Sequence, residues 1–268
     1  VINFKFPDSL YLASNFDIES LSAYPNGQFV QLKGNLQRGG EIILNPQDEF
    51  TTHVTPHMKF LTNIKAPRYS PIGQGLSINK VADFIYDNLG EYPHQKILVS
   101  ELDYNKDPLY GLNQLPSFIR PYEEQFQFEM KFLKTSINSI LRETMFLNPR
   151  KDQWLNSAIA NYLIIAYVEE YYPDQKLMGK LSKIWGFRSF ELAKMDFNDQ
   201  YSFLYNLTAR KNLDQALRTS NDSLIWFNQK IANKYKAGLG LAYLADYIGK
   251  ERVDESIKTF FKYYKLNT

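Results

Sequence analysis

Two long helical patterns, separated by an Asn-Pro step, constrain the fold of this 268-residue chain more than any other feature. In the first pattern, from about 122 to 147, apolar residues recur at the three- and four-residue spacing of a single helix face. These residues are Phe126, Met130, Leu133, Ile137, Ile140 and Leu141. Pro149 ends this helix, because the residue before a proline is restricted to extended conformations. The second helix runs from Asp152 to about Tyr172, and the pair predicts a large helical core.

The first third of the chain has the pattern of short β-strands. Ile2, Phe4 and Phe6 alternate with polar residues, and strand-like runs cover 29–32 and 41–44. Turn signals rich in Gly, Pro and Asn separate these runs. This part of the chain is therefore expected to form a β-rich segment.

The transition between the two regions is predicted near residue 70. The segment 66–75 contains two Pro and two Gly and is expected to be a loop. Ser77 is expected to cap the first helix and Gly90 to end it. The fold class is therefore predicted as α+β, with a β-rich segment at 1–70 that ends a preceding β domain, and a mostly helical domain at 71–268.

Composition removes several classes of function and partner. The chain has no cysteine, which excludes disulfides and cysteine-based zinc sites. Its formal net charge is +2 without a long basic run, so no nucleic-acid partner is expected. No apolar run reaches the ~18 residues of a membrane span. The compartment stays open between cytoplasm and periplasm. The chain begins at Val1 rather than Met, so we expect other domains of a longer protein as partners.

The second long helix carries a recognisable motif, Trp154-Leu155-Asn156-Ser157. It resembles the W-L-N-E-G-x-A-x-Y helix of zinc aminopeptidases of the aminopeptidase N type, gluzincins with a thermolysin-like catalytic domain. The resemblance implies that Ser157 stands where the family has its third zinc ligand, a Glu. It also implies that Lys134 and Asn138 stand at the two His positions of the H-E-x-x-H helix, with Thr135 at the general base. No H-E-x-x-H occurs in this chain.

Three further segments are similar to the same family, in the same order along the chain. Residues 81–93 match its helix followed by G-x-Y-P, and residues 110–114 stand where it has G-x-M-E-N. Residues 235–238 resemble its Y-x-K-G segment, whose Tyr stabilises the oxyanion. The resemblance thus implies a substrate groove formed by Gly111, Leu112, Asn113, Gln114 and Tyr235. Asn113 replaces the Glu that pairs with a free α-amino group in the family, so the grip on a substrate amino terminus is weakened.

The residues at the matched positions do not suit the family's chemistry. Zinc needs ligands with lone pairs, whereas Lys134 offers an ammonium, and Asn138 and Ser157 are poor zinc ligands. Thr135 cannot accept a proton near neutral pH. Zinc lowers the pKa of water from about 15.7 to about 7, which is worth roughly 12 kcal/mol toward the nucleophile. We therefore expect a pseudoenzyme without zinc or another cofactor, which binds a peptide or protein or forms a structural part of a larger protein.

Lys134 is predicted to fill the space that zinc would take, paired with a nearby acid. One alternative is an active zinc metallo-aminopeptidase with displaced ligands, which would need His53, His57 or His94 close to carboxylates. The spacing of His53 and His57 would suit two ligands on a helix, but Pro56 interrupts it. A third hypothesis is a helical scaffold that is not peptidase-like, with accidental motif matches.

Overall fold

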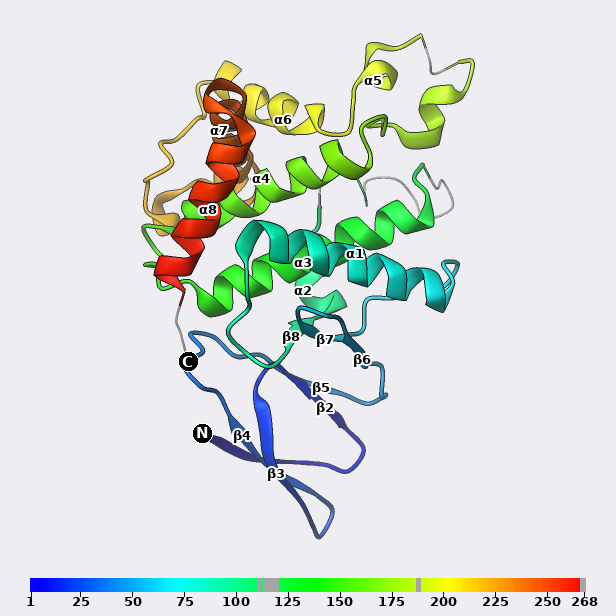
Figure 1. The fold of residues 1–268 in the computed structure, drawn as a ribbon, viewed down its shortest axis with the longest axis vertical. Helices are drawn as coiled ribbons and strands as arrows, with labels where there is room; N and C mark the ends of the chain where they lie inside the picture. Colours follow the sequence, from blue (N-terminus) through cyan, green and yellow to red (C-terminus); the bar gives the residue numbers. More distant parts are fainter. Residues whose placement is uncertain (110–111, 113–120, 187–188, 266–268) are drawn as a thin grey trace.

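The computed structural model describes residues 1–109, 112, 121–186 and 189–265. The strands gather at one end of the molecule and the helices at the other (Figure 1). The strands are β1 Ile2–Phe6, β2 Tyr11–Ser14, β3 Asp17–Tyr24, β4 Gly27–Lys33, β5 Ile42–Asn45, β6 Thr51–Val54, β7 Lys59–Thr62 and β8 Ile97–Val99. The α-helices are α1 Pro71–Leu89, α2 Glu101–Lys106, α3 Glu124–Thr144, α4 Gln153–Tyr171, α5 Glu191–Lys194, α6 Asp199–Arg210, α7 Asn233–Ile248 and α8 Lys250–Tyr264. The predicted α+β class, β-rich first and then mostly helical, is confirmed.

The N-terminal strands form two small antiparallel sheets. One has the order β1-β4-β3, and the other pairs β2 with β5. Because side chains alternate across a strand, one face of β1 and β4 is turned inward. Phe6, Val30 and Leu32 form a small core of their own on that face. The strands predicted at 2–6, 29–32 and 41–44 are therefore present.

A third sheet connects the β-rich segment with the helices. Its order is β6-β7-β8, and β7 runs parallel to β8 with Phe60 opposite Ile97. Phe60 is fully buried and packs edge-on against Phe132 of α3, with ring centroids 5.0 Å apart. Both phenylalanines belong to the main hydrophobic core. Strand pairing thus joins residues on both sides of position 70, and the division of the chain at that position stays a prediction.

Helix α1 begins earlier than predicted. Its first residue is Pro71, and the side chain of Ser70 caps it by accepting a hydrogen bond from Gly73 N at 3.1 Å. Proline suits the first helical position because its missing N–H would have no partner there. The expected cap at Ser77 was therefore wrong, and of the loop expected at 66–75 only residues 66–70 are outside the helix. The helix ends as predicted at Gly90, whose φ of +82° favours glycine.

A buried glutamate ties α1, α3 and α4 together. Glu129 of α3 has no exposed surface and pairs with Lys80 Nζ of α1 at 2.5 Å. The hydroxyls of Tyr167 and Tyr172 donate to the same oxygen, Oε2, at 2.7 and 2.6 Å, and the Ser77 hydroxyl donates to Oε1 at 2.7 Å. Burial alone would raise the pKa of Glu129, but these partners and Ser77 hold it below its ordinary value. A fully satisfied network of this kind rigidifies the helix arrangement.

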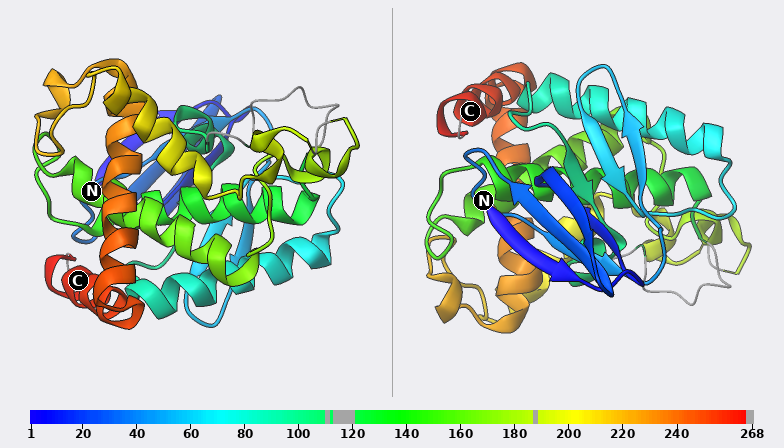
Figure 2. Two further views of the ribbon diagram at one scale, coloured as in Figure 1. Left: turned by 90° about the horizontal axis from the view of Figure 1, so that it is seen from above. Right: turned by 90° about the horizontal axis from the view of Figure 1, so that it is seen from below.

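Helix α7 crosses α4 at close range (Figure 2). A Cβ at Gly238 of α7 would lie only 2.5 Å from Asn161 Cβ, so glycine permits this approach of the two backbones. A π-helical turn, Asn228–Ala232, leads directly into α7. Among the described residues no helix is both long and apolar enough to cross a membrane.

Candidate functional site

A cavity of about 550 Å³ opens between α2, α3, α4 and the start of α7. It receives side chains from segments between Asp103 and Tyr235, 132 positions apart in the sequence, because the crossing of α7 over α4 brings them to one place. The residues predicted at the degenerate metal and catalytic positions all line it. They are Lys134, Thr135, Asn138, Ser157 and Tyr235. The structure thus brings this set together, while the role of each residue stays a prediction.

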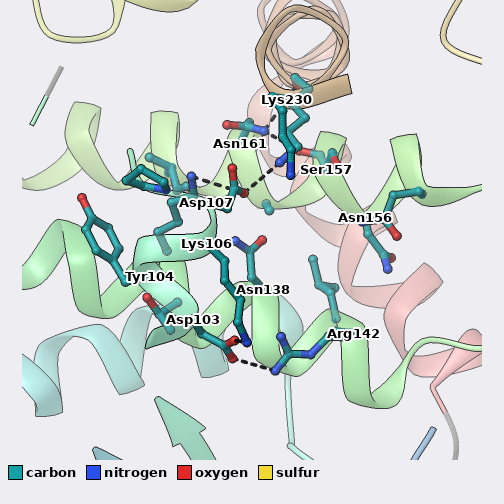
Figure 3. Close-up of a pocket in the computed structure, with 18 of the residues that line it drawn as sticks. Asp103, Tyr104, Lys106, Asp107, Asn138, Arg142, Asn156, Ser157, Asn161 and Lys230 are labelled. Carbon is teal, nitrogen blue, oxygen red and sulfur yellow. Dashed lines mark hydrogen bonds and ion pairs between the residues drawn. The ribbon is translucent and has the colours of Figure 1, made fainter. Parts of the chain in front are cut away.

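Lys134 lines the cavity as part of a charged triad around Asp107, which is labelled in Figure 3. Its Nζ lies 3.5 Å from Asp107 Oδ2, and the same oxygen accepts a hydrogen bond from Lys234 Nζ at 2.8 Å. The expected acid partner of Lys134 is therefore Asp107. Burial lowers the pKa of Lys134 to about 8, and the nearby Lys234 adds to the decrease while Asp107 opposes it. Burial would raise the pKa of Asp107, but the two lysines outweigh it and hold that pKa below its ordinary value.

The remaining predicted residues are polar groups on buried helix faces. The Thr135 hydroxyl donates to the Lys131 carbonyl at 2.8 Å, one helical turn earlier. Ser157 is 8% exposed, and its carbonyl accepts a hydrogen bond from Asn161 Nδ2 at 2.8 Å. Tyr235 packs edge-on against Tyr201, with ring centroids 4.8 Å apart. These contacts hold the cavity wall rigidly in place.

A second charged group forms the opposite side of the cavity. Asp103 of α2 accepts from Lys106 Nζ at 2.9 Å and from Arg142 Nη2 at 3.0 Å. Figure 3 shows both cations beside this carboxylate. Burial would raise the pKa of Asp103, but hydrogen bonds with Glu41, Lys106 and Arg142 lower it to about 2. Asp103 is therefore ionised at neutral pH.

Basic residues outnumber acidic ones in the cavity. Five of the described lining residues are Lys or Arg and two are Asp. Asp107 and Asp103 are each held by two basic side chains, so their charge is compensated locally. Because Glu41 also pairs with Lys106 and Arg142, the excess positive charge lies on the side of the cavity that holds the other basic residues, Lys134, Lys230 and Lys234.

The predicted substrate-groove residues lie mostly where the structure gives no description. Gly111, Asn113 and Gln114 are outside the described residues. Leu112 stands in a turn, is buried in the main hydrophobic core and is not among the residues that line the cavity. Tyr235 is thus the member of this predicted set that the structure places at the cavity.

The three histidines lie outside the cavity, although His57 Nε2 does approach a carboxylate, Asp83 Oδ1, at 3.4 Å. His53 lies in β6 beside Thr51, with Nε2 3.2 Å from Oγ1. His57 stacks on Tyr86 with ring centroids 3.9 Å apart, and His94 lies against Tyr92. None of the three lines the cavity. Within the described ranges there is no group of three or more His, Asp or Glu residues that could hold a metal ion.

Several cavity residues were not identified from the sequence. Asn161 could have been found, because it lies four residues after Ser157 and therefore on the same helix face. Lys234 directly precedes the matched Tyr235, and this closeness in sequence is a weaker indication than the helical spacing of Asn161. Asp107 and Lys230 carry no local signal, since one follows the end of α2 and the other lies in the π-helical turn.

Comparisons with known proteins place the fold. No protein-family model and no curated protein matches the chain. Several solved structures do match it in fold. The M1 zinc metallopeptidase from Deinococcus radiodurans superposes with a TM-score of 0.60 at 13% identity, and so does a variant of it bound to a Tyr-Ser-Ala substrate. A two-domain M1 zinc metallopeptidase variant bound to L-arginine gives 0.58 at 12%. Each match covers 98% of this chain and 56% of the other, so the chain spans little more than half of these neighbours.

Proposed function

We propose that this chain is a peptidase-like domain without zinc and without catalysis, which binds a peptide or protein segment in its 550 Å³ cavity. The observation that carries the proposal is the triad of Lys134, Asp107 and Lys234. The triad places two ammonium groups, and a carboxylate that is already paired with them, at the position where the resemblance implies a metal ion. The fold shared with M1 zinc metallopeptidases supports the peptidase-like part of the proposal.

The residues at the matched positions do not fit a zinc ion. A structural or catalytic zinc site takes three or four ligands from His, Cys, Asp and Glu. Here Lys134 carries a proton at neutral pH, with a pKa of about 8. The carboxylate closest to it, Asp107, already neutralises two lysines. A divalent cation at this place would be repelled by the ammonium groups and would have to displace them from Asp107.

Peptide binding is supported by the size and shape of the site. Pockets for small ligands are typically about 300 to 1,000 Å³, and this cavity falls within that range. The neighbour that holds a Tyr-Ser-Ala substrate shows that the same fold accommodates a short peptide. Other domains of a longer protein are partners under the same proposal, since the neighbours extend well beyond the matched part.

The proposal is tested by rebuilding the metal site on the same helices. The changes are Lys134→His, Thr135→Glu, Asn138→His and Ser157→Glu. Positions 134 and 138 are one helical turn apart and share a face, so two histidines there can reach one ion. We expect the fourfold variant to take up one zinc ion per chain, measured by elemental analysis after dialysis, whereas the unchanged protein retains none.

A matched control carries the first three changes together with Asn156→Glu in place of Ser157→Glu. Residue 156 also lines the cavity, but it is displaced by about 100° around α4 from residue 157, so its carboxylate does not take the position of the family's third ligand and zinc affinity should fall. Stoichiometric zinc in the unchanged protein, or aminopeptidase activity that a chelator abolishes, would overturn the proposal.

A further inference from the structure

A smaller cavity of about 210 Å³ adjoins the main one. The two share wall residues from α4, the π-helical turn and α7. The shared residues are Gln153, Ser157, Lys230 and Lys234. A chain segment lying in the main cavity can therefore extend a side chain or its end into the smaller one.

The smaller cavity is lined by cations without an acid among its described lining residues. The basic residues are Arg150, Lys151, Lys230 and Lys234. Arg150 reaches Asp222 at 3.3 Å through an exposed ion pair, and Lys234 is held by Asp107. Within the described part of the chain, no carboxylate lies within ion-pair distance of Lys151 or Lys230. This arrangement leaves positive charge available to a ligand.

Two further features direct hydrogen-bond donors to the same place. Gln153 and Trp154, the first residues of the 19-residue helix α4, line the smaller cavity. The first N–H groups of a helix lack intrahelical partners and favour an anion. Asp152, the residue before the helix, makes no capping hydrogen bond with its side chain.

The third feature is a buried amide without a partner. Asn233 is 4% exposed and lines the smaller cavity. In the described structure neither its Oδ1 nor its Nδ2 has a hydrogen-bond partner. A buried polar group without a partner destabilises the folded state, so such groups are rare in folded proteins. A bound oxyanion would accept a hydrogen bond from Nδ2.

We infer that the smaller cavity is a carboxylate subsite, which takes the acidic side chain of a peptide lying in the main cavity. This inference rests on the proposed peptide-binding function and specifies its ligand as an acidic peptide. The shared wall favours a peptide over a free anion, because Lys230 and Lys234 face both cavities.

The experiment is a competition between two peptide mixtures on immobilised protein. Both are random heptapeptides, identical except that one carries Glu and the other Gln at the central position. Retained peptides are quantified by mass spectrometry. Since a charge-assisted hydrogen bond contributes about 1.5 to 3 kcal/mol, the unchanged protein should enrich the Glu peptides about tenfold or more. Lys230→Glu should bring the ratio close to one, and added salt should reduce it.

Two variants and one competitor complete the test. Lys183→Glu makes the same charge change at an exposed lysine outside both cavities and should leave the enrichment intact. Asn233→Leu should reduce the enrichment of Glu peptides, as Lys230→Glu does. Equal retention of Glu and Gln peptides would overturn the carboxylate subsite but leave peptide binding standing. Retention of neither mixture would overturn both. Binding of inorganic phosphate without any acidic peptide would show a free-anion site and refute the peptide assignment.

Discussion

Asp107 Oδ2 is shared by two ammonium groups, with Lys134 Nζ at 3.5 Å and Lys234 Nζ at 2.8 Å. The two lysines differ in environment, since 9% of the Lys134 side chain is exposed and 23% of the Lys234 side chain. One carboxylate thus compensates two cations at the centre of the cavity. The free-energy cost of removing charge from water is therefore larger for Lys134, the more buried of the two lysines.

Replacing Lys134 with Met should stabilise the protein at neutral pH. Met keeps the apolar stem of the side chain and removes a buried charge. The pKa of Lys134 is lowered from 10.5 to about 8, which corresponds to roughly 3 kcal/mol of destabilisation of the charged form. Loss of the contact with Asp107 offsets part of this, so we expect a gain of about 1 to 3 kcal/mol in urea unfolding at pH 7.

The gain should shrink at high pH. Between pH 8 and 10.5 the folded protein has lost the proton of Lys134 while the unfolded chain still holds it. The stability of the unchanged protein therefore rises as pH increases through this window. The Met variant lacks the titrating group at position 134, so this contribution to the rise is absent from it. A stability difference that stays constant from pH 7 to 10 would contradict the burial of a charged Lys134.

Asp107→Asn should destabilise the protein, because it leaves two neighbouring ammonium groups without their counter-charge. Removal of one partner from a fully buried ion pair typically costs about 3 to 5 kcal/mol, and because 32% of the Asp107 side chain and 23% of the Lys234 side chain are exposed, we expect a smaller loss of about 1 to 3 kcal/mol. The double variant with Lys134→Met should recover part of the loss. Additive effects in this double-mutant cycle would argue against direct coupling of the two residues.

Titration of Glu143 should give protein stability a second pH dependence, opposite in direction to that of Lys134. It is fully buried at the end of α3, where Tyr92 Oη donates to it at 2.8 Å. Burial raises the pKa of Glu143 to about 7, although Tyr92 and Arg142 oppose the increase. Between its ordinary pKa of 4.5 and 7 the folded protein keeps a proton that the unfolded chain has lost, so stability falls as pH rises through this window.

Glu143→Gln should therefore change stability little at pH 4.5 and increase it at pH 8. The amide still accepts the hydrogen bond from Tyr92, and it removes the cost of ionising a buried carboxyl, up to about 3 kcal/mol. Urea unfolding at the two pH values measures the difference. The same gain at both would show that this carboxyl does not titrate in the folded protein.

The periodic parts of the fold could be predicted from the sequence. The apolar stripe expected for the first long helix is buried in α3, and the pair α3 and α4 forms the centre of the core. The convergence of Lys134, Asn138 and Ser157 on one cavity was implied by the resemblance to the zinc aminopeptidases. Helical spacing alone places only Lys134 and Asn138, four residues apart, on one face of α3.

The parts that depend on long-range packing could not be predicted. Asp107 reaches Lys134 because the chain after α2 folds back toward α3, a contact that no periodicity encodes. Lys230 reaches the cavity from a π-helical turn, where the ordinary helical spacing does not apply. Helix α1 begins at Pro71, six residues before the expected cap Ser77, because the proline and two glycines that favour a loop in the sequence lie within its first turns.

Two glycines of α7 provide a direct test of how closely this helix approaches the cavity. A Cβ at Gly238 would lie 2.5 Å from Asn161 Cβ and 3.3 Å from Tyr162 N, whereas a Cβ at Gly240 would meet nothing within 4 Å. Alanine favours a helix over glycine by about 1 kcal/mol at either position. Gly240→Ala should therefore stabilise the protein by up to about 1 kcal/mol.

Gly238→Ala should instead destabilise it by about 1 to 3 kcal/mol, because the added methyl group forces α7 away from α4. The displacement would also move Lys234 and Tyr235, so retention of acidic peptides should fall with it. Urea unfolding and the peptide competition measure the two effects on the same pair of variants. An equal gain in stability for both substitutions would show that α7 does not lie close enough to α4 to hold the cavity in the form described.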